Sequence, residues 1–100
     1  MNKYLLQGTL IAKPGFREEL TEILKRASRL MKEKAKGCEM YAVGHRAGDP
    51  HTVFITEVWA TKKDHDASLA VDGVRELIGE AMNILAEMPK QGKEITVVNL

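Results

Sequence analysis

Four side chains in one short stretch of the chain are the clearest candidates for chemistry. The segment FITEVWATKKDHDASLA, residues 54–70, contains Glu57, Trp59, His65 and Ser68. An ordinary histidine titrates at about pH 6.5, so His65 can accept a proton at neutral pH, and the Glu57 carboxylate is the competing base. An indole N–H needs a partner when the ring is buried. The segment is therefore either one wall of an active site or a strand-to-helix corner in which Trp59 fills the core.

Other patterns that carry chemistry are absent from the sequence. It has no glycine-rich nucleotide loop, no nucleophile elbow and no histidine or cysteine cluster with metal-ligand spacing, so no metal site is expected. His45 and His51 flank a predicted turn and are interpreted as solvated residues, while Cys38 is interpreted as a small buried filler. The lysines and arginines of the first predicted helix lack interleaved aromatic residues, which indicates a solvated face rather than a nucleic-acid surface.

The length of 100 residues predicts one domain over residues 1–100. The 15 lysines and arginines balance 14 acidic residues, so no strong field favours a nucleic acid or a membrane. A single cysteine excludes an intrachain disulfide and suits a reducing compartment. The sequence shows neither a secretory signal nor an apolar run of about 18 residues, and a cytoplasmic protein is expected.

Hydrophobic periodicity predicts the elements that position these side chains. Period-two alternation indicates four strands, at residues 3–12, 38–46, 52–60 and 94–100. An amphipathic helical stripe runs from Phe16 to Met31, and Gly37 is a suitable stop.

A second helical region follows the third strand. Thr61 with Asp64 resembles a capping box, so a short helix is expected to begin there, and Asp72 is expected to cap a second piece that reaches Leu85. The order β-α-β-β-α-β is the α+β, ferredoxin-like arrangement with a four-stranded antiparallel sheet.

Both faces of the predicted sheet carry apolar residues, although two helical segments can cover only one face. Soluble monomers usually avoid an exposed apolar patch of that size. A second copy packed sheet against sheet solves the problem, so a two-fold homodimer is expected. Gln7 and Glu57 stand among apolar neighbours on the strands, and a polar group between sheet and helices needs partners or water. They indicate either a small polar-spotted pocket or two residues at the sheet margin.

The chain also resembles a known family over nearly its whole length. The resemblance lies in AKPGFREELTEILK after the first strand, then GCEMYAV, a hairpin with GDP, and FITEVWATKKDHDASL. These segments are similar to the antibiotic biosynthesis monooxygenase family, dimeric α+β barrel proteins that include quinol monooxygenases. The resemblance implies oxygenation of a small electron-rich aromatic, such as a quinol or hydroxynaphthalene, by O₂ without flavin, haem or metal.

One position departs from the family pattern. Many members have a histidine nine residues beyond the tryptophan, where this chain has Ser68, and His65 lies one turn earlier. A haem-degrading branch uses an asparagine, the tryptophan and that histidine, which correspond here to Gln7, Trp59 and Ser68. Serine is a poor haem ligand, so haem degradation is discounted.

The resulting hypothesis places an aromatic substrate against Trp59, with Gln7 as hydrogen-bond donor and Ser68 as a further binding residue. His65, or alternatively Glu57, takes the phenolic proton. Two alternatives stay open. The same pocket could serve a dimeric binding module without turnover, which the serine at position 68 favours, or an isomerase or lyase that acts on a small ring.

Overall fold

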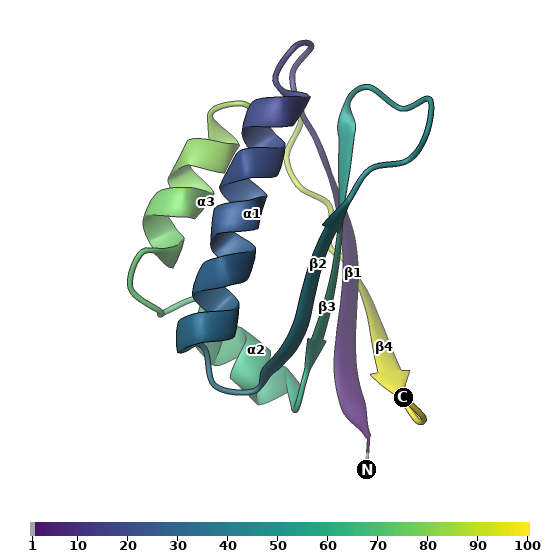
Figure 1. Cartoon of the computed structure of the whole chain (residues 1–100), viewed down its shortest axis with the longest axis vertical. Helices are drawn as coiled ribbons and strands as arrows, with labels where there is room; N and C mark the ends of the chain where they lie inside the picture. Colours follow the sequence, from purple (N-terminus) through teal and green to yellow (C-terminus); the bar gives the residue numbers. More distant parts are fainter. Residues whose placement is uncertain (1) are drawn as a thin grey trace.

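Three helices lie on one side of a four-stranded antiparallel sheet in the computed structural model, which describes residues 2–100 (Figure 1). The strands are β1 (Lys3–Ile11), β2 (Cys38–Gly44), β3 (Thr52–Trp59) and β4 (Lys93–Val97). The helices are α1 (Arg17–Lys34), α2 (Lys62–Ser68) and α3 (Val74–Met82). The strand order β2-β3-β1-β4 places the two central strands, β3 and β1, side by side. This confirms the predicted ferredoxin-like α+β fold.

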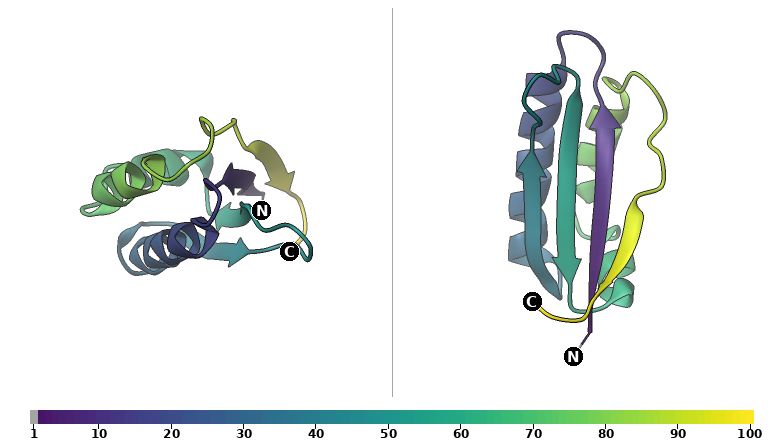
Figure 2. Two further views of the ribbon diagram at one scale, coloured as in Figure 1. Left: turned by 90° about the horizontal axis from the view of Figure 1, so that it is seen from above. Right: turned by 90° about the vertical axis from the view of Figure 1, so that its right-hand side faces the viewer.

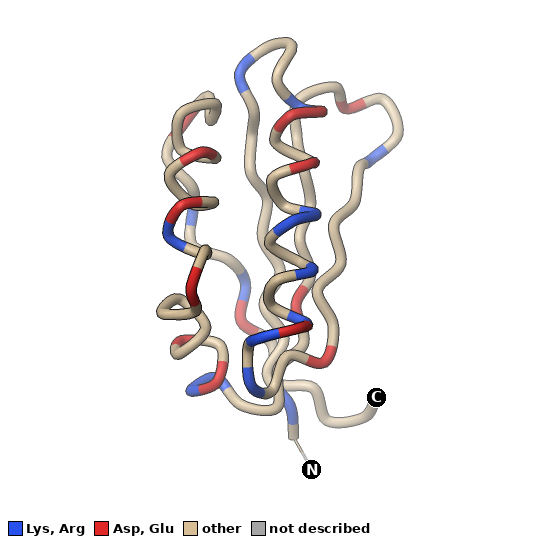
Figure 3. The backbone as a smooth tube through the Cα atoms, turned by 60° about the vertical axis from the view of Figure 1, so that its left-hand side comes forward, with Lys and Arg blue, Asp and Glu red and all other residues tan. Residues whose placement is uncertain are grey.

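Helix α1 is amphipathic and buries one stripe of side chains against the sheet and α3. Its buried residues are Leu20, Ile23, Leu24, Ala27, Ser28 and Met31. Acidic residues occupy its first turn and basic residues its last, which complements the helix dipole. Figure 3 shows this separation along α1, with acidic residues near its beginning and mostly basic residues toward its end.

The two short helices begin differently. Thr61 caps α2 as predicted, because its hydroxyl accepts a hydrogen bond from the Asp64 backbone N–H at 3.1 Å. The expected cap at Asp72 is wrong. The N-cap of α3 is Gly73, whose φ of 93° turns the chain into the helix, and no side chain caps that end. Asp72 thus lies one residue too early to reach the free N–H groups of α3.

The strand pairing determines which side chains share a face. In the β1–β3 register Leu6 lies opposite Glu57, and Leu10 lies opposite Val53; these residues face the helices. Directly opposed residues of paired strands share a face. Helix α3 packs mainly on α1 and makes few contacts with the strands, so space remains between α3 and the sheet.

The other face of the sheet has no helix over it, and the chain beyond β4 crosses it near one end (Figure 2). Apolar side chains remain accessible there, including Met40 and Ile95, each about two-fifths exposed. No helix among residues 2–100 is long and apolar enough to cross a bilayer.

Candidate active site

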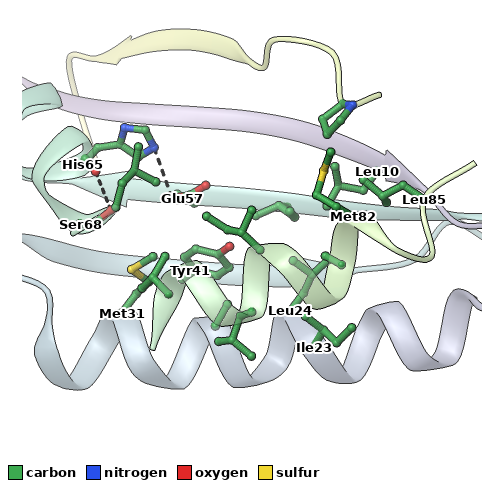
Figure 4. A pocket seen from close by; sticks show the side chains of 18 residues that line it. Leu10, Ile23, Leu24, Met31, Tyr41, Glu57, His65, Ser68, Met82 and Leu85 are labelled. Atoms are coloured by element: carbon green, nitrogen blue, oxygen red, sulfur yellow. Dashed lines mark hydrogen bonds and ion pairs between the residues drawn. The ribbon is translucent and has the colours of Figure 1, made fainter. Parts of the chain in front are cut away.

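A cavity of about 240 Å³ lies between the helix-covered face of the sheet and helices α1, α2 and α3. Its lining is apolar except for four side chains with polar atoms, which are those of Tyr41, Glu57, His65 and Ser68. Glu57, His65 and Ser68 gather at one end, while Leu10, Met82 and Leu85 line the other (Figure 4). A largely apolar cavity with a few convergent polar groups is the usual form of a small-molecule site.

Local structure explains why two of these side chains point into the cavity from α2. The Thr61 cap sets the first turn of α2 directly after β3. His65 and Ser68 are three residues apart, so they project from the same side of the helix. Both line the cavity.

Glu57 contributes a carboxyl group that is shielded from water. The residue is 9% exposed, and its Oε1 accepts a hydrogen bond of 3.0 Å from Trp59 Nε1. Burial raises the pKa of Glu57, while the Trp59 N–H and the nearby His65 act in the opposite direction. The carboxyl group therefore keeps its proton to a higher pH than an exposed glutamate does.

His65 lies between the cavity and the surface. Its Nε2 is 3.9 Å from Glu57 Oε1, and its Nδ1 is 3.0 Å from Asp66 Oδ1. The rings of Tyr4 and Trp59 flank it, with centroids 5.5 Å and 5.7 Å from the imidazole. The imidazole is thus held in one orientation, close to a second ionisable group.

Ser68 has less freedom than an exposed serine. It is 2% exposed, and its hydroxyl donates a hydrogen bond of 2.5 Å to the backbone oxygen of His65. The Ser68 hydroxyl therefore already donates its hydrogen to an acceptor within α2. The oxygen can still accept a bond from a ligand.

The structure corrects the expected position of Trp59. The indole is 0% exposed and packs with Met31 and Val74, and it does not line the cavity. An aromatic ligand in the cavity would meet Glu57 and His65 before it met the indole. Trp59 instead supports the site from behind, since it donates to Glu57 and packs edge-on against His65.

Gln7 does not join the other candidates, which corrects their expected grouping. In the β1–β3 register Gln7 pairs with Thr56, whereas Glu57 pairs with Leu6. Neighbouring residues of a strand point to opposite faces, so Gln7 projects to the uncovered face. There it borders a shallow depression with Thr9 and Thr56, on the far side of the sheet from the cavity.

Sequence reasoning missed Tyr41, which projects into the cavity from β2 (Figure 4). Burial raises the pKa of its hydroxyl, and the Glu57 charge adds to the effect. No group among residues 2–100 hydrogen-bonds to this hydroxyl, so it is available to a ligand. Simple alternation could not find it, because a β-bulge between Cys38 and Met40 places both Cys38 and Tyr41 opposite helix-facing residues of β3.

Comparison with known proteins identifies the family. The model of the antibiotic biosynthesis monooxygenase family matches residues 4–79, so the chain belongs to this family. A comparison with curated protein sequences finds no match.

Solved structures agree with the family assignment. A candidate antibiotic biosynthesis monooxygenase from Chloroflexus aurantiacus is 31% identical, with a TM-score of 0.83 over 97% of this chain and 94% of that one. Similarly described proteins from Caulobacter crescentus (14% identity, TM-score 0.88, 98% and 92% of the two chains) and Nitrosomonas europaea (19%, 0.84, 96% and 90%) share the fold.

Proposed function

We propose that the chain is a monooxygenase that oxidises a small hydroxyaromatic compound with O₂ and needs no organic cofactor or metal. The observation that carries this proposal is the cavity, because its polar end pairs an imidazole with a buried carboxyl group. Membership of the antibiotic biosynthesis monooxygenase family supports an oxygenase reaction. The substrate class is a quinol or a hydroxynaphthalene.

His65 serves as the base in this scheme. The substrate hydroxyl lies at the polar end of the cavity, where its O–H bond breaks and an N–H bond forms at Nε2. The resulting anion is electron-rich and reacts with O₂. One oxygen atom enters the ring and the other leaves as water, so that a hydroxynaphthalene and O₂ give a naphthoquinone and H₂O. The ring supplies all four electrons that O₂ requires.

Two neighbouring groups steady the oxygenated anion. Burial raises the pKa of both Glu57 and Tyr41, which favours their neutral, hydrogen-bond-donating forms. Donors that are already oriented in a site with little water stabilise developing negative charge more strongly than water does. Glu57 is also the competing base when it is ionised.

The cavity volume limits the size of the substrate. An apolar protein cavity of about 150 Å³ accommodates benzene. A volume of about 240 Å³ accordingly suits one ring or two fused rings. The hydrocarbon part would lie against Leu10, Met82 and Leu85, away from the polar end.

Oxygen consumption by the metal-free protein tests this function. With a panel of quinols and hydroxynaphthalenes, the wild-type chain is expected to consume one O₂ for each quinone formed. His65→Gln is expected to lower turnover by about 10²-fold or more, as the loss of a general base does. The matched control is His51→Gln, which changes an exposed histidine of the β2–β3 hairpin and leaves turnover unchanged.

Affinity is measured separately under anaerobic conditions, so that binding and chemistry are not confused. His65→Gln should bind the substrate within about twofold of wild type, since most of the contact area is apolar. Tight binding without oxygen uptake would instead identify a small-molecule-binding module. Full turnover in His65→Gln would remove His65 from the mechanism and leave Glu57 as the base.

A further inference from the structure

We propose that Asp66 is a positioning residue that fixes the tautomer of His65, so that the unprotonated Nε2 faces the cavity. Its catalytic consequence rests on the proposed oxygenase function, but the tautomer itself does not. Asp66 is adjacent to His65 on α2 and does not line the cavity. It therefore acts on the reaction through the imidazole and not through the substrate.

The hydrogen bond between the two side chains determines where the proton lies. His65 Nδ1 is 3.0 Å from Asp66 Oδ1. An ionised carboxylate can only accept hydrogen bonds, so Nδ1 must be the nitrogen that carries the proton. A neutral imidazole carries a proton on only one of its two ring nitrogens. The hydrogen bond made by Nδ1 therefore leaves Nε2 without a proton. Nε2 is left as the basic atom.

The unprotonated Nε2 of His65 points to the end of the cavity where it could accept a proton from a substrate hydroxyl. Nε2 lies 3.9 Å from Glu57 Oε1. This separation is too long for a direct hydrogen bond, yet one hydroxyl oxygen can lie about 2.8 Å from both atoms. The flanking rings of Tyr4 and Trp59 keep the imidazole in this orientation.

The other charged groups near His65 do not compete with Asp66 for the Nδ1 proton. From β3, Glu57 faces the opposite nitrogen. From β1, the Tyr4 hydroxyl donates to Glu94 of β4 at 2.7 Å, and Lys62 pairs with the same carboxylate at 2.5 Å. Of the carboxylates in the described part of the chain, Asp66 alone lies within hydrogen-bond distance of the imidazole.

Nitrogen NMR of the ¹⁵N-labelled chain tests the tautomer without any substrate. Long-range correlation of ring protons with ring nitrogens distinguishes the protonated from the bare nitrogen, and the signals that vanish in His65→Gln identify His65. When its imidazole is neutral, wild-type His65 is expected to be mainly the Nδ1–H form. In Asp66→Ala the fraction of this form should fall at least twofold, because no acceptor holds the proton there. Asp72→Ala, a change of an exposed aspartate between α2 and α3, should leave it unchanged.

Turnover and affinity give a second readout that a merely structural role would not produce. With a hydroxynaphthalene as probe, Asp66→Ala should lower kcat by about 10- to 100-fold, the range found when a metal-binding histidine loses the carboxylate that orients it. The anaerobic Kd should stay within about twofold of wild type. A fall in affinity that matched the fall in turnover would overturn the positioning role.

The two readouts separate the failure of this inference from the failure of the proposed function. A wild-type His65 that is mainly Nε2–H, or a tautomer that Asp66→Ala does not alter, overturns the inference whatever the activity. A tautomer that changes as expected supports it even if no protein consumes oxygen, and the proposed function then falls alone. Unchanged turnover in an active Asp66→Ala enzyme overturns the catalytic consequence.

Discussion

At the scale of single residues, the site depends on ionisable groups that are held away from water. Burial raises the pKa of Glu57, and the hydrogen bond donated by the Trp59 N–H offsets this rise only in part. The folded chain therefore binds this proton more tightly than the unfolded chain does. By linkage, the contribution of Glu57 to stability is fully present below the ordinary pKa of about 4.5 and is lost as the pH rises toward the folded value.

Replacement of Glu57 by glutamine should remove this loss. The amide carbonyl of the new side chain can still accept the Trp59 N–H, so Glu57→Gln is expected to raise the melting temperature at neutral pH by a few degrees. The difference from wild type should shrink as the pH falls toward about 4.5 and should be absent below it. Calorimetry over this pH range checks the prediction, with the exposed Glu87→Gln as control. A melting temperature below that of wild type at neutral pH would show that the ionised carboxylate is stabilised in the fold.

At the scale of elements, the turn that follows α1 lies against both the end of β3 and the beginning of α2. Gly37 follows α1 with φ of 82°, and its carbonyl accepts a hydrogen bond of 2.8 Å from the Ala60 N–H after β3. A Cβ at position 37 would lie 2.9 Å from the Cβ of Asp64, in the first turn of α2. Because Gly37 has no Cβ, the turn after α1 can lie directly against the first turn of the helix that carries His65.

Two glycine substitutions can measure the free-energy cost of adding a Cβ at position 37. Gly48 in the β2–β3 hairpin has φ of 80° but open space around its missing Cβ. Both Gly37→Ala and Gly48→Ala should lose about 1 kcal/mol to the left-handed backbone. Gly37→Ala should lose about 1 kcal/mol more, because the added methyl group meets Asp64. Urea unfolding of both variants tests this, and equal losses would show that α2 moves aside freely.

At the scale of the whole molecule, one face of the sheet has no helix packed against it (Figure 2). It presents Met40 and Ile95 to solvent, while all three helices lie on the opposite side. Burial of such a face between two copies of the chain would stabilise a dimer through the hydrophobic effect. The predicted two-fold homodimer therefore stays the expected assembly.

Sedimentation at micromolar concentration tests the assembly. The wild-type chain is expected to sediment as a dimer, and Ile95→Lys should weaken association at least tenfold, since it places a charge within the apolar face. Ile95 is 41% exposed, so the change should spare the fold of each subunit. Met88→Lys provides the control, because Met88 is 72% exposed outside the sheet. A monomeric wild-type chain would refute the sheet-to-sheet dimer.

Much of the site was predictable because several of its residues lie close together in the sequence, on one strand or one helix. Trp59 lies two residues beyond Glu57 on one strand, and Ser68 three beyond His65 on one helix, so period and cap placed each pair on one face. Other relations were not predictable. Whether Gln7 shared a face with Glu57 depended on the β1–β3 register, and the bulge in β2 brought Tyr41 to the helix side.

The sequence alone determined the elements, their order and the family, because each follows from residue types at short, regular spacing or from their succession along the chain. Only the tertiary structure decided that Trp59 lies behind the cavity, that Gln7 lies outside it, and that His65 sits between Glu57 and Asp66. The physical reason is that hydrophobic periodicity indicates only which residues share a face within one helix or strand. The distances between elements depend on strand register, on a bulge and on how far α3 lies from the sheet.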